Sequence, residues 1–347
     1  MIEVSSISDG NEETFAQSAT LNQEQTELRV LAERFPEDAE IAGRLATALA
    51  NLSGEQDLSD TLQTVTELRE LAQHFPADAQ IAARLAYGLG NLSAEQDMTC
   101  TLQTIAELRE LAQRFPADAQ IAAQLALALA NLSCEQDLLG TVQTAAELRE
   151  LAGRFPDDAK IAARLATGLA NLSCEQDLSD RTHTVTELRE LAGRFPADAE
   201  IAVGLALGLA NLSCEQDVTG TVQTVTELRK LAQRFSEDAE IPARLATGLV
   251  NLSVEQDVTG IMQTVAELRN LAGRFPEDTR IAARLALSLG NLSFKQDLTG
   301  IMQTVTELRE LAQRFPDNAE IADLLVGTLF LLSTMAEIAA LSAQAQE

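Results

Sequence analysis

The chain has 347 residues, of which 46% are hydrophobic and 22% are charged, and 53 acidic residues stand against 25 basic ones. A net charge of −28 repels phosphate at long range, so the composition argues against nucleic acid or an anionic membrane and favours a basic or neutral partner. With no Trp, one Tyr and two His, there is little material for aromatic cages, histidine metal sites or histidine acid–base catalysis. We therefore expect a protein that is not an enzyme, with no catalytic residue, no metal site and no cofactor.

The first segment, residues 1–20, is polar and is expected to be partly helical. It has no basic stretch followed by an apolar run, so it does not read as a secretory signal, and it favours a cytoplasmic location.

Residues 21–333 repeat themselves with a period of forty. Asn-Leu-Ser recurs seven times from Asn51 to Ser293, and Glu-Leu-Arg recurs eight times from Glu27 to Arg309. Residues 131–170 and 171–210 are identical at 28 of 40 positions. Copies this alike should share one supersecondary structure, and each is too small to bury its own apolar face. We therefore predict a single array of eight stacked repeats over residues 21–333.

Each copy has the pattern of two helices. In the copy that includes residues 98–115, the apolar residues follow one another at intervals of 4, 3, 3, 4 and 3, which places them on one face of an α-helix. They are Met98, Leu102, Ile105, Leu108, Ala112 and Phe115. Asp97 is a suitable N-cap, and Pro116 disfavours helix at Phe115. A second helix starts with Asp118 as its N-cap. No window alternates as a strand does, so the fold class is all-α, with about eight helical hairpins.

The C-terminal segment, residues 334–347, is predicted to be a capping helix over the open end of the last repeat, because Leu331, Met335 and Ile338 continue at helical spacing. The stretch from Leu324 to Leu341 is apolar enough to raise a transmembrane interpretation, but Glu337 and several Ser and Thr residues argue against it. We expect no membrane partner and favour a homodimer contact through this helix.

The segment from Pro76 to Asn91 resembles the first helix of a tetratricopeptide repeat. The signature places of that family fall on Ala82, Leu85, Ala86 and Leu89 in this helix, and on Thr104, Leu108, Leu111 or Ala112, and Pro116 in the second. The Trp and Tyr of the signature are missing, so HEAT-like and other αα-solenoids remain competing labels. The resemblance covers nearly the whole chain.

This resemblance implies a right-handed αα-superhelix, or solenoid, whose concave groove is lined by the first helix of each repeat and receives a peptide or a partner helix. The groove-facing places of the family carry over to Gln80, Ala83, Arg84, Tyr87 and Asn91 and to the positions forty residues apart. The carboxylate-clamp subtype needs a Lys and an Asn where this chain has Ala83 and Tyr87, which argues against chaperone C-terminal peptides as the ligand.

Two columns of polar residues lie at these places. The first, which we call the Asn ladder, is the Asn found at every fortieth position from Asn51 to Asn291. These side chains could hydrogen-bond an extended peptide backbone, or each Asn could instead bond a neighbouring backbone group near its helix end. In the Arg column, Arg44 and Arg244 have a Glu four residues earlier, whereas Lys160 with Arg164 and Arg280 with Arg284 are like-charged pairs that we interpret as places for a partner's carboxylates. The candidate binding residues are Arg44, Asn51, Gln80, Arg84, Tyr87, Asn91, Gln124, Asn131, Lys160, Arg164, Asn171, Asn211, Arg244, Asn251, Arg280, Arg284 and Asn291.

Features present in every copy point to architecture instead. A different, uniform column of Arg runs from Arg29 to Arg309, with a Glu two residues before each Arg. We interpret this uniform column as inter-repeat ion pairs or as packing of the Arg side-chain stems. Pro242 stands inside a helix start, and we predict a local irregularity there, with a bend as one form of it.

The function that these patterns favour is a noncatalytic scaffold that binds a peptide or partner protein in the groove. The partner is expected to be basic, or to present carboxylates to the arginine-rich places. The alternative is a structural protein that self-associates through its apolar C-terminal helix, and an enzyme or small-molecule receptor is disfavoured because no phosphate loop, nucleophile elbow or paired-cysteine site is found.

Overall fold

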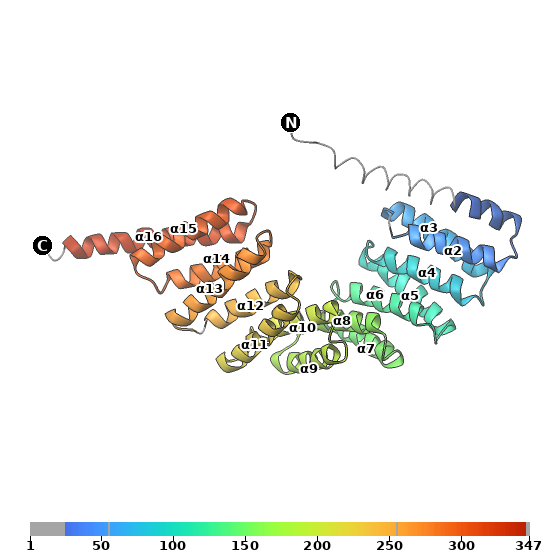
Figure 1. Ribbon diagram of the computed structural model, residues 1–347, viewed down its shortest axis with the longest axis horizontal. Helices are drawn as coiled ribbons and strands as arrows, with labels where there is room; N and C mark the ends of the chain where they lie inside the picture. Colours follow the sequence, from blue (N-terminus) through green and yellow to red (C-terminus); the bar gives the residue numbers. More distant parts are fainter. Residues whose placement is uncertain (1–24, 55, 255, 345–347) are drawn as a thin grey trace, which may run out of the picture. The chain divides into compact units, whose positions relative to one another are not determined.

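The computed structural model describes residues 25–54, 56–254 and 256–344, with side chains as far as residue 341. In these ranges every regular element is an α-helix: residues 25–34 form the first, and fifteen more follow. The prediction of an all-α chain of about eight helical hairpins is confirmed (Figure 1). The helices are α2 (Ala39–Leu52), α3 (Leu58–His74), α4 (Ala79–Ser93), α5 (Met98–Arg114), α6 (Ala119–Leu132), α7 (Leu138–Arg154), α8 (Ala159–Glu175), α9 (Leu178–Arg194), α10 (Ala199–Leu212), α11 (Val218–Arg234), α12 (Glu240–Val254), α13 (Val258–Arg274), α14 (Thr279–Ser293), α15 (Leu298–Arg314) and α16 (Ala319–Gln344).

The predicted helix ends are set by capping aspartates. The side chain of Asp97 accepts a hydrogen bond from the backbone N–H of Cys100 at the start of α5, and Asp118 caps α6 in the same way. Helix α5 ends as expected before Pro116, with Phe115 as its C-cap. Because the same residues recur in each copy, the same turns recur along the chain.

The chain divides into two compact units, one up to Gly168 and one from Leu169, and helix α8 runs through this boundary. Within each unit, an even-numbered helix packs against the even-numbered helices of the adjoining repeats and against its odd-numbered neighbours. Small residues such as Ala86 and Ala126, both 0% exposed, let the even-numbered helices approach closely. Leu89 and Leu108 are also fully buried, and each such leucine stabilises the fold by about 1.5–3 kcal/mol.

The uniform Arg and Glu columns form ion pairs between consecutive repeats, as their uniformity predicts. Arg109 donates through Nε and Nη2 to the two carboxylate oxygens of Glu147, at 2.8 and 2.7 Å. The hydrogen bond to Glu147 raises the pKa of Arg109, although partial burial opposes the shift. The ion pairs with this 38-residue separation are Arg29–Glu67, Arg69–Glu107, Arg109–Glu147, Arg189–Glu227, Arg229–Glu267 and Arg269–Glu307.

Helix α12 tests the prediction made for Pro242. The helix starts at Glu240, one residue later than the equivalent helices, and is continuous from there to Val254. The prediction of an irregularity inside the helix is therefore wrong. A proline in the first turn removes only an N–H that has no intrahelical partner, so the change is confined to the start.

Helix α16 extends 26 residues without interruption, so the described part of segment 334–347 continues the last repeat and is not a separate element. Its residues Ala319–Leu341 are long and apolar enough, by length and composition alone, to cross a membrane, and 6% of the most apolar window is buried. The four cysteines are free thiols, and Cys134, Cys174 and Cys214 are exposed.

Candidate functional site

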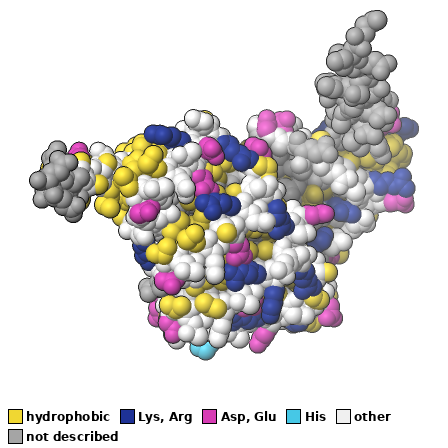
Figure 2. All heavy atoms as spheres, turned by 60° about the vertical axis from the view of Figure 1, so that its left-hand side comes forward, with side chains coloured by type: hydrophobic (Ala, Val, Ile, Leu, Met, Phe, Trp, Pro, Cys, Tyr) yellow, Lys and Arg dark blue, Asp and Glu magenta, His cyan; other side chains and the backbone are white. Residues whose placement is uncertain are grey.

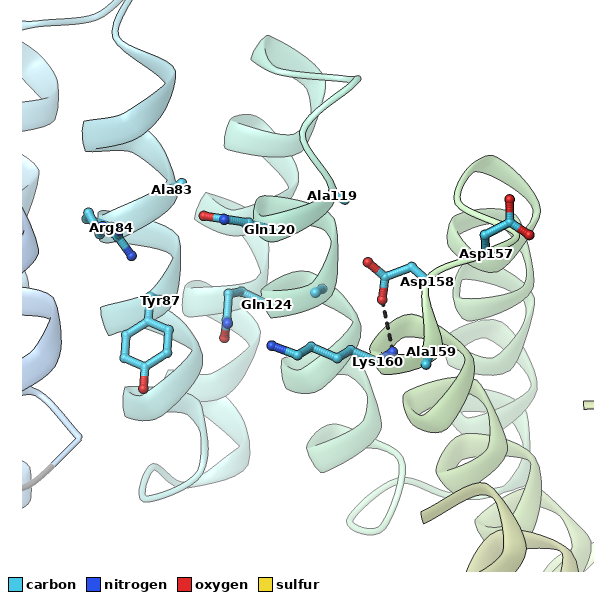
Figure 3. A pocket seen from close by; sticks show the side chains of 11 residues that line it. Ala83, Arg84, Tyr87, Ala119, Gln120, Gln124, Asp157, Asp158, Ala159 and Lys160 are labelled. Atoms are coloured by element: carbon cyan, nitrogen blue, oxygen red, sulfur yellow. Dashed lines mark hydrogen bonds between the residues drawn. The ribbon is translucent and has the colours of Figure 1, made fainter. Parts of the chain in front are cut away.

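A cavity of about 540 Å³ lies in the first unit, over helices α4 and α6 and the start of α8 (Figure 3). Four of the predicted binding residues line it together: Arg84, Tyr87, Gln124 and Lys160. The forty-residue period explains their convergence, since Arg84, Gln124 and Lys160 occupy nearly the same turn of consecutive even-numbered helices. The other lining residues are Ala83, Ala119, Gln120, Ala123, Asp157, Asp158 and Ala159.

The side chain of Gln124, which lines this cavity, packs against Gly90 of the preceding repeat. It stands where most repeats carry Arg, and its Oε1 lies so close to Gly90 that a Cβ added at that glycine would collide with it. The same pairing recurs where Leu324 replaces the Arg, because Gly290 stands opposite it. At these two places, a glycine in the preceding repeat accompanies a replacement of the Arg by Gln or Leu, a pairing that the sequence analysis does not use.

Two polar atoms in the cavity are buried without a hydrogen-bond partner. They are Nε of Arg84, a donor, and Oε1 of Gln124, an acceptor. A buried polar atom without a partner costs about 1–3 kcal/mol, and neither of these two atoms is open to a ligand, because each is buried from solvent. Nε of Arg244, at the equivalent place in the second unit, also has no partner, but the Arg244 guanidinium lies 3.7 Å from Glu240.

The two cations at the cavity form no ion pair within the described part of the chain, although Asp157 and Asp158 also line it. Neither Arg84 nor Lys160 has a carboxylate within ion-pair distance among the residues that the structure describes, and the Lys160 side chain extends toward Gln124 (Figure 3). Asp158 is engaged elsewhere, because it caps α8 and accepts the backbone N–H of Lys160 at 2.9 Å and of Ile161 at 3.1 Å. The cavity therefore offers two cationic donors, the amides of Gln120 and Gln124, the exposed carboxylate of Asp157 and the ring of Tyr87, which is 39% exposed.

A second cavity, of about 470 Å³, brings together Arg44, Asn51 and Gln80 over α2 and α4. Arg44 donates to Glu40 at 2.9 Å, the helix-surface pairing expected from their spacing. This cation already has a carboxylate partner, so the second cavity is less suited to an anionic group than the first.

In the second unit the arginines of the column are neutralised by the chain itself. Arg280 contacts Asp278 at 2.7 Å and Glu240 at 2.5 Å, and Arg284 donates to Glu320 at 3.1 Å. The hydrogen bond to Asp278, helped by Glu240 and opposed by burial, raises the pKa of Arg280. The like-charged pair of Arg280 and Arg284 therefore obtains its carboxylates from its own repeat and from the two adjoining repeats, and needs none from a partner.

The Asn ladder bonds to the preceding repeat. Asn251 donates from Nδ2 to Oγ of Ser213 at 2.8 Å, and this hydroxyl donates in turn to the Ala210 carbonyl at 2.6 Å. The acceptor is therefore a side chain, and not the backbone group expected as one alternative from the sequence. The same Asn-to-Ser bond is made by Asn91, Asn131, Asn211 and Asn251.

The remaining predicted residues are placed apart from the first cavity. Arg164 and Asn171 lie in α8 and are half-buried, Asn291 is half-buried in α14, and Asn51 is exposed. No group of three or more metal-ligating side chains occurs among the described residues.

No protein-family model matches the chain, and no curated protein sequence matches it. Among solved structures, a human IFIT1 dimer with m7Gppp-AAAA is similar, with 12% identity, a TM-score of 0.39, and 92% of this chain and 71% of that one covered. The TPR domain of P58(IPK) follows at 9% identity and TM-score 0.26, covering 93% and 96%, and yeast Tom70 at 9% and 0.23, covering 97% and 98%. With scores this low, the assignment of the chain as an all-α array of helix-pair repeats rests on its own helices and their forty-residue period.

Proposed function

We propose that this protein is a noncatalytic scaffold that binds a peptide segment of a partner protein on its even-numbered helices, and that the cavity at Arg84 and Lys160 receives a carboxylate of that segment. The single observation that carries the proposal is the pair of cations left without a carboxylate in a chain whose net charge is −28. Surplus acidic groups neutralise Arg44, Arg280 and Arg284, but not these two residues.

The cavity also has the complementary groups that a peptide needs. Beside the two cations, the lining offers the amides of Gln120 and Gln124 as polar contacts and the methyl groups of Ala83, Ala119 and Ala123 as apolar ones. A carboxylate from a side chain or a C-terminus would then lie between the Arg84 guanidinium and the Lys160 ammonium, where charge-assisted hydrogen bonds are strongest. Tyr87 supplies an exposed ring for an apolar neighbour on the peptide.

The test compares captured proteins for three forms of the full chain. The wild type, the double variant Arg84→Gln with Lys160→Gln, and the matched control Arg280→Gln with Arg284→Gln are immobilised and exposed to lysate of the source cells at low and moderate salt. Captured proteins are identified by mass spectrometry. The control removes the same number of positive charges from arginines that the chain itself neutralises.

We expect at least one protein to be retained by the wild type and the control but lost from the cavity variant. Its capture should weaken as salt rises, because a carboxylate bound at a surface cavity is screened. A synthetic peptide of the captured region should bind about tenfold more weakly when its carboxylate is amidated, corresponding to about 1.4 kcal/mol. If the cavity variant and the control retain the same proteins, the proposed site is wrong.

A further inference from the structure

We propose that the exposed face of α16 pairs with the same face of a second copy, in an antiparallel helix pair whose two-fold axis passes beside Thr334. This inference is independent of the proposed peptide cavity, which lies in the other unit. It starts from the length of α16, since the other even-numbered helices have 14 to 17 residues and α16 has 26. Hydrophobic side chains gather beside the grey C-terminal residues in Figure 2.

The exposed face of α16 is not shaped to receive another repeat. In α14, Ala282 and Ala286 are 2% and 0% exposed where the next even-numbered helix packs. In α16 the residue forty positions after Ala286 is Val326, and Phe330 stands forty positions after Gly290. Val326 is 65% exposed and Phe330 is 75% exposed. Side chains of this size hold a neighbouring helix too far away for the close packing that alanine and glycine permit.

The spacing along this face is the same in both directions from Thr334. Gly327, Phe330, Ile338 and Leu341 lie seven residues before, four before, four after and seven after Thr334. At about 100° per residue, all four lie within about 40° of the direction of Thr334. In an antiparallel pair with two-fold symmetry, each position meets its mirror position in the other copy. Such a face is therefore complementary to itself.

The paired positions also fit in size and polarity. Phe330 meets Ile338 of the second copy, and these side chains are 75% and 56% exposed. Leu341, 66% exposed, meets Gly327, where an added Cβ would have no atom within 4 Å. At the axis the Thr334 hydroxyl already donates to the Phe330 carbonyl at 3.0 Å, so it needs no partner from the second copy.

The charges favour a second copy over a lipid bilayer. Helix α16 carries Glu320, Asp323 and Glu337 and has no Lys or Arg between Ala319 and Gln344. A membrane-spanning helix is commonly anchored by basic residues on its cytoplasmic side, and carboxylates within the span are costly. In the antiparallel register Glu337 lies opposite Leu331, so this carboxylate does not face an acidic side chain of the second copy.

The size of the contact sets the expected affinity. Three large apolar side chains from each copy, with the space beside Gly327, bury on the order of 1,000 Å² in total. This area is below that of stable specific interfaces, about 1,200–2,000 Å², and is typical of weak ones. We therefore expect a dissociation constant on the order of micromolar.

Sedimentation equilibrium of the full chain, from about 1 µM to about 200 µM, measures this association. We expect a monomer–dimer equilibrium in the wild type and a loss of dimer of at least tenfold in Phe330→Glu. The matched control is Val326→Glu, which removes an equally exposed apolar residue about 80° away from the axis direction and should leave the dimer unchanged. Circular dichroism checks that both variants remain helical.

Cross-linking tests the register independently. In a background with the four cysteines replaced by serine, Thr334→Cys should form an oxidised dimer, because residues on a two-fold axis meet their own copies, whereas Asp323→Cys should not. Cross-linking of both variants would indicate a parallel pair and would overturn the register. A chain that stays monomeric at all concentrations, or that floats with phosphatidylcholine vesicles without dimerising, overturns the proposal.

Discussion

The Asn ladder can be separated into structural and ligand-binding roles by changing one amide to a carboxylate. In the wild type, Nδ2 of Asn251 donates to Oγ of Ser213 at 2.8 Å and to Sγ of Cys214 at 3.2 Å. Ser213 is 3% exposed, and its own proton is committed to the Ala210 carbonyl at 2.6 Å. Asn251→Asp therefore places an acceptor against an acceptor.

The magnitude follows from these contacts. Asn251→Ala loses one ordinary hydrogen bond and should lower the free energy of unfolding by about 1 kcal/mol. Asn251→Asp also leaves a carboxylate facing a lone pair in a half-buried place, so we expect a loss of about 2 kcal/mol. Because a protonated carboxyl can donate again, the Asp variant should recover part of this loss below about pH 4.

Urea denaturation followed by circular dichroism gives the free energy, and hydrogen exchange of the α12 amides shows whether the loss is local to that repeat, as expected for an array whose repeats contact only their neighbours. The control is Asn51→Asp, whose side chain is exposed and whose stability should change by less than about 0.5 kcal/mol. If Asn251→Asp is as stable as the wild type, the bond to Ser213 does not stabilise the array, and the ligand interpretation of the ladder regains support.

Three further predictions concern the repeat contacts. A double-mutant cycle on Arg229 and Glu267, which are 38% and 29% exposed, should give a coupling of about 1 kcal/mol that decreases between about 0.05 M and 1 M salt, and an unchanged value would contradict an ion pair. Gly208→Ala should lower the free energy of unfolding by about 1–3 kcal/mol, because the added Cβ would lie 2.7 Å from Cδ1 of Leu188. Gly193→Ala adds a Cβ with no atom within 4 Å and should raise the melting temperature slightly. Equal effects of the two substitutions on stability would refute the packing argument. The pKa of Asp278 is lowered, since burial raises it but hydrogen bonds from a guanidinium and from backbone N–H groups lower it more. Its stabilisation is present above the unfolded value of about 4 and is lost as the pH falls through the folded value, so Asp278→Asn should flatten the acid limb of a stability–pH curve.

The helices could be predicted from the sequence because their signals are local. Asp97, Phe115 and Pro116 fix the ends of α5 through capping and through the restricted conformation before proline, and each effect acts within a few residues. The continuation of α16 past residue 333 was equally local, since neither Gly nor Pro interrupts Ser333 and Thr334.

The candidate site depended on contacts that sequence periodicity does not define. The bond from Asn251 to Ser213 spans 38 residues, and that separation is set by how neighbouring helices pack. The ion pairs of Arg280 and Arg284 join different repeats, so the like charges within one helix gave no indication of them. The sequence named Arg84 and Lys160 separately, in different columns, and only the packing of α4, α6 and α8 places both at one cavity.

The ion pairs with the 38-residue separation all have the same direction: a guanidinium from one repeat is held by a carboxylate from the next. Each module therefore presents an identical acceptor to its predecessor and an identical donor to its successor. Unequal recombination that inserts or deletes one whole module joins the same complementary ends, so the array could change in length during evolution without breaking a single one of these links.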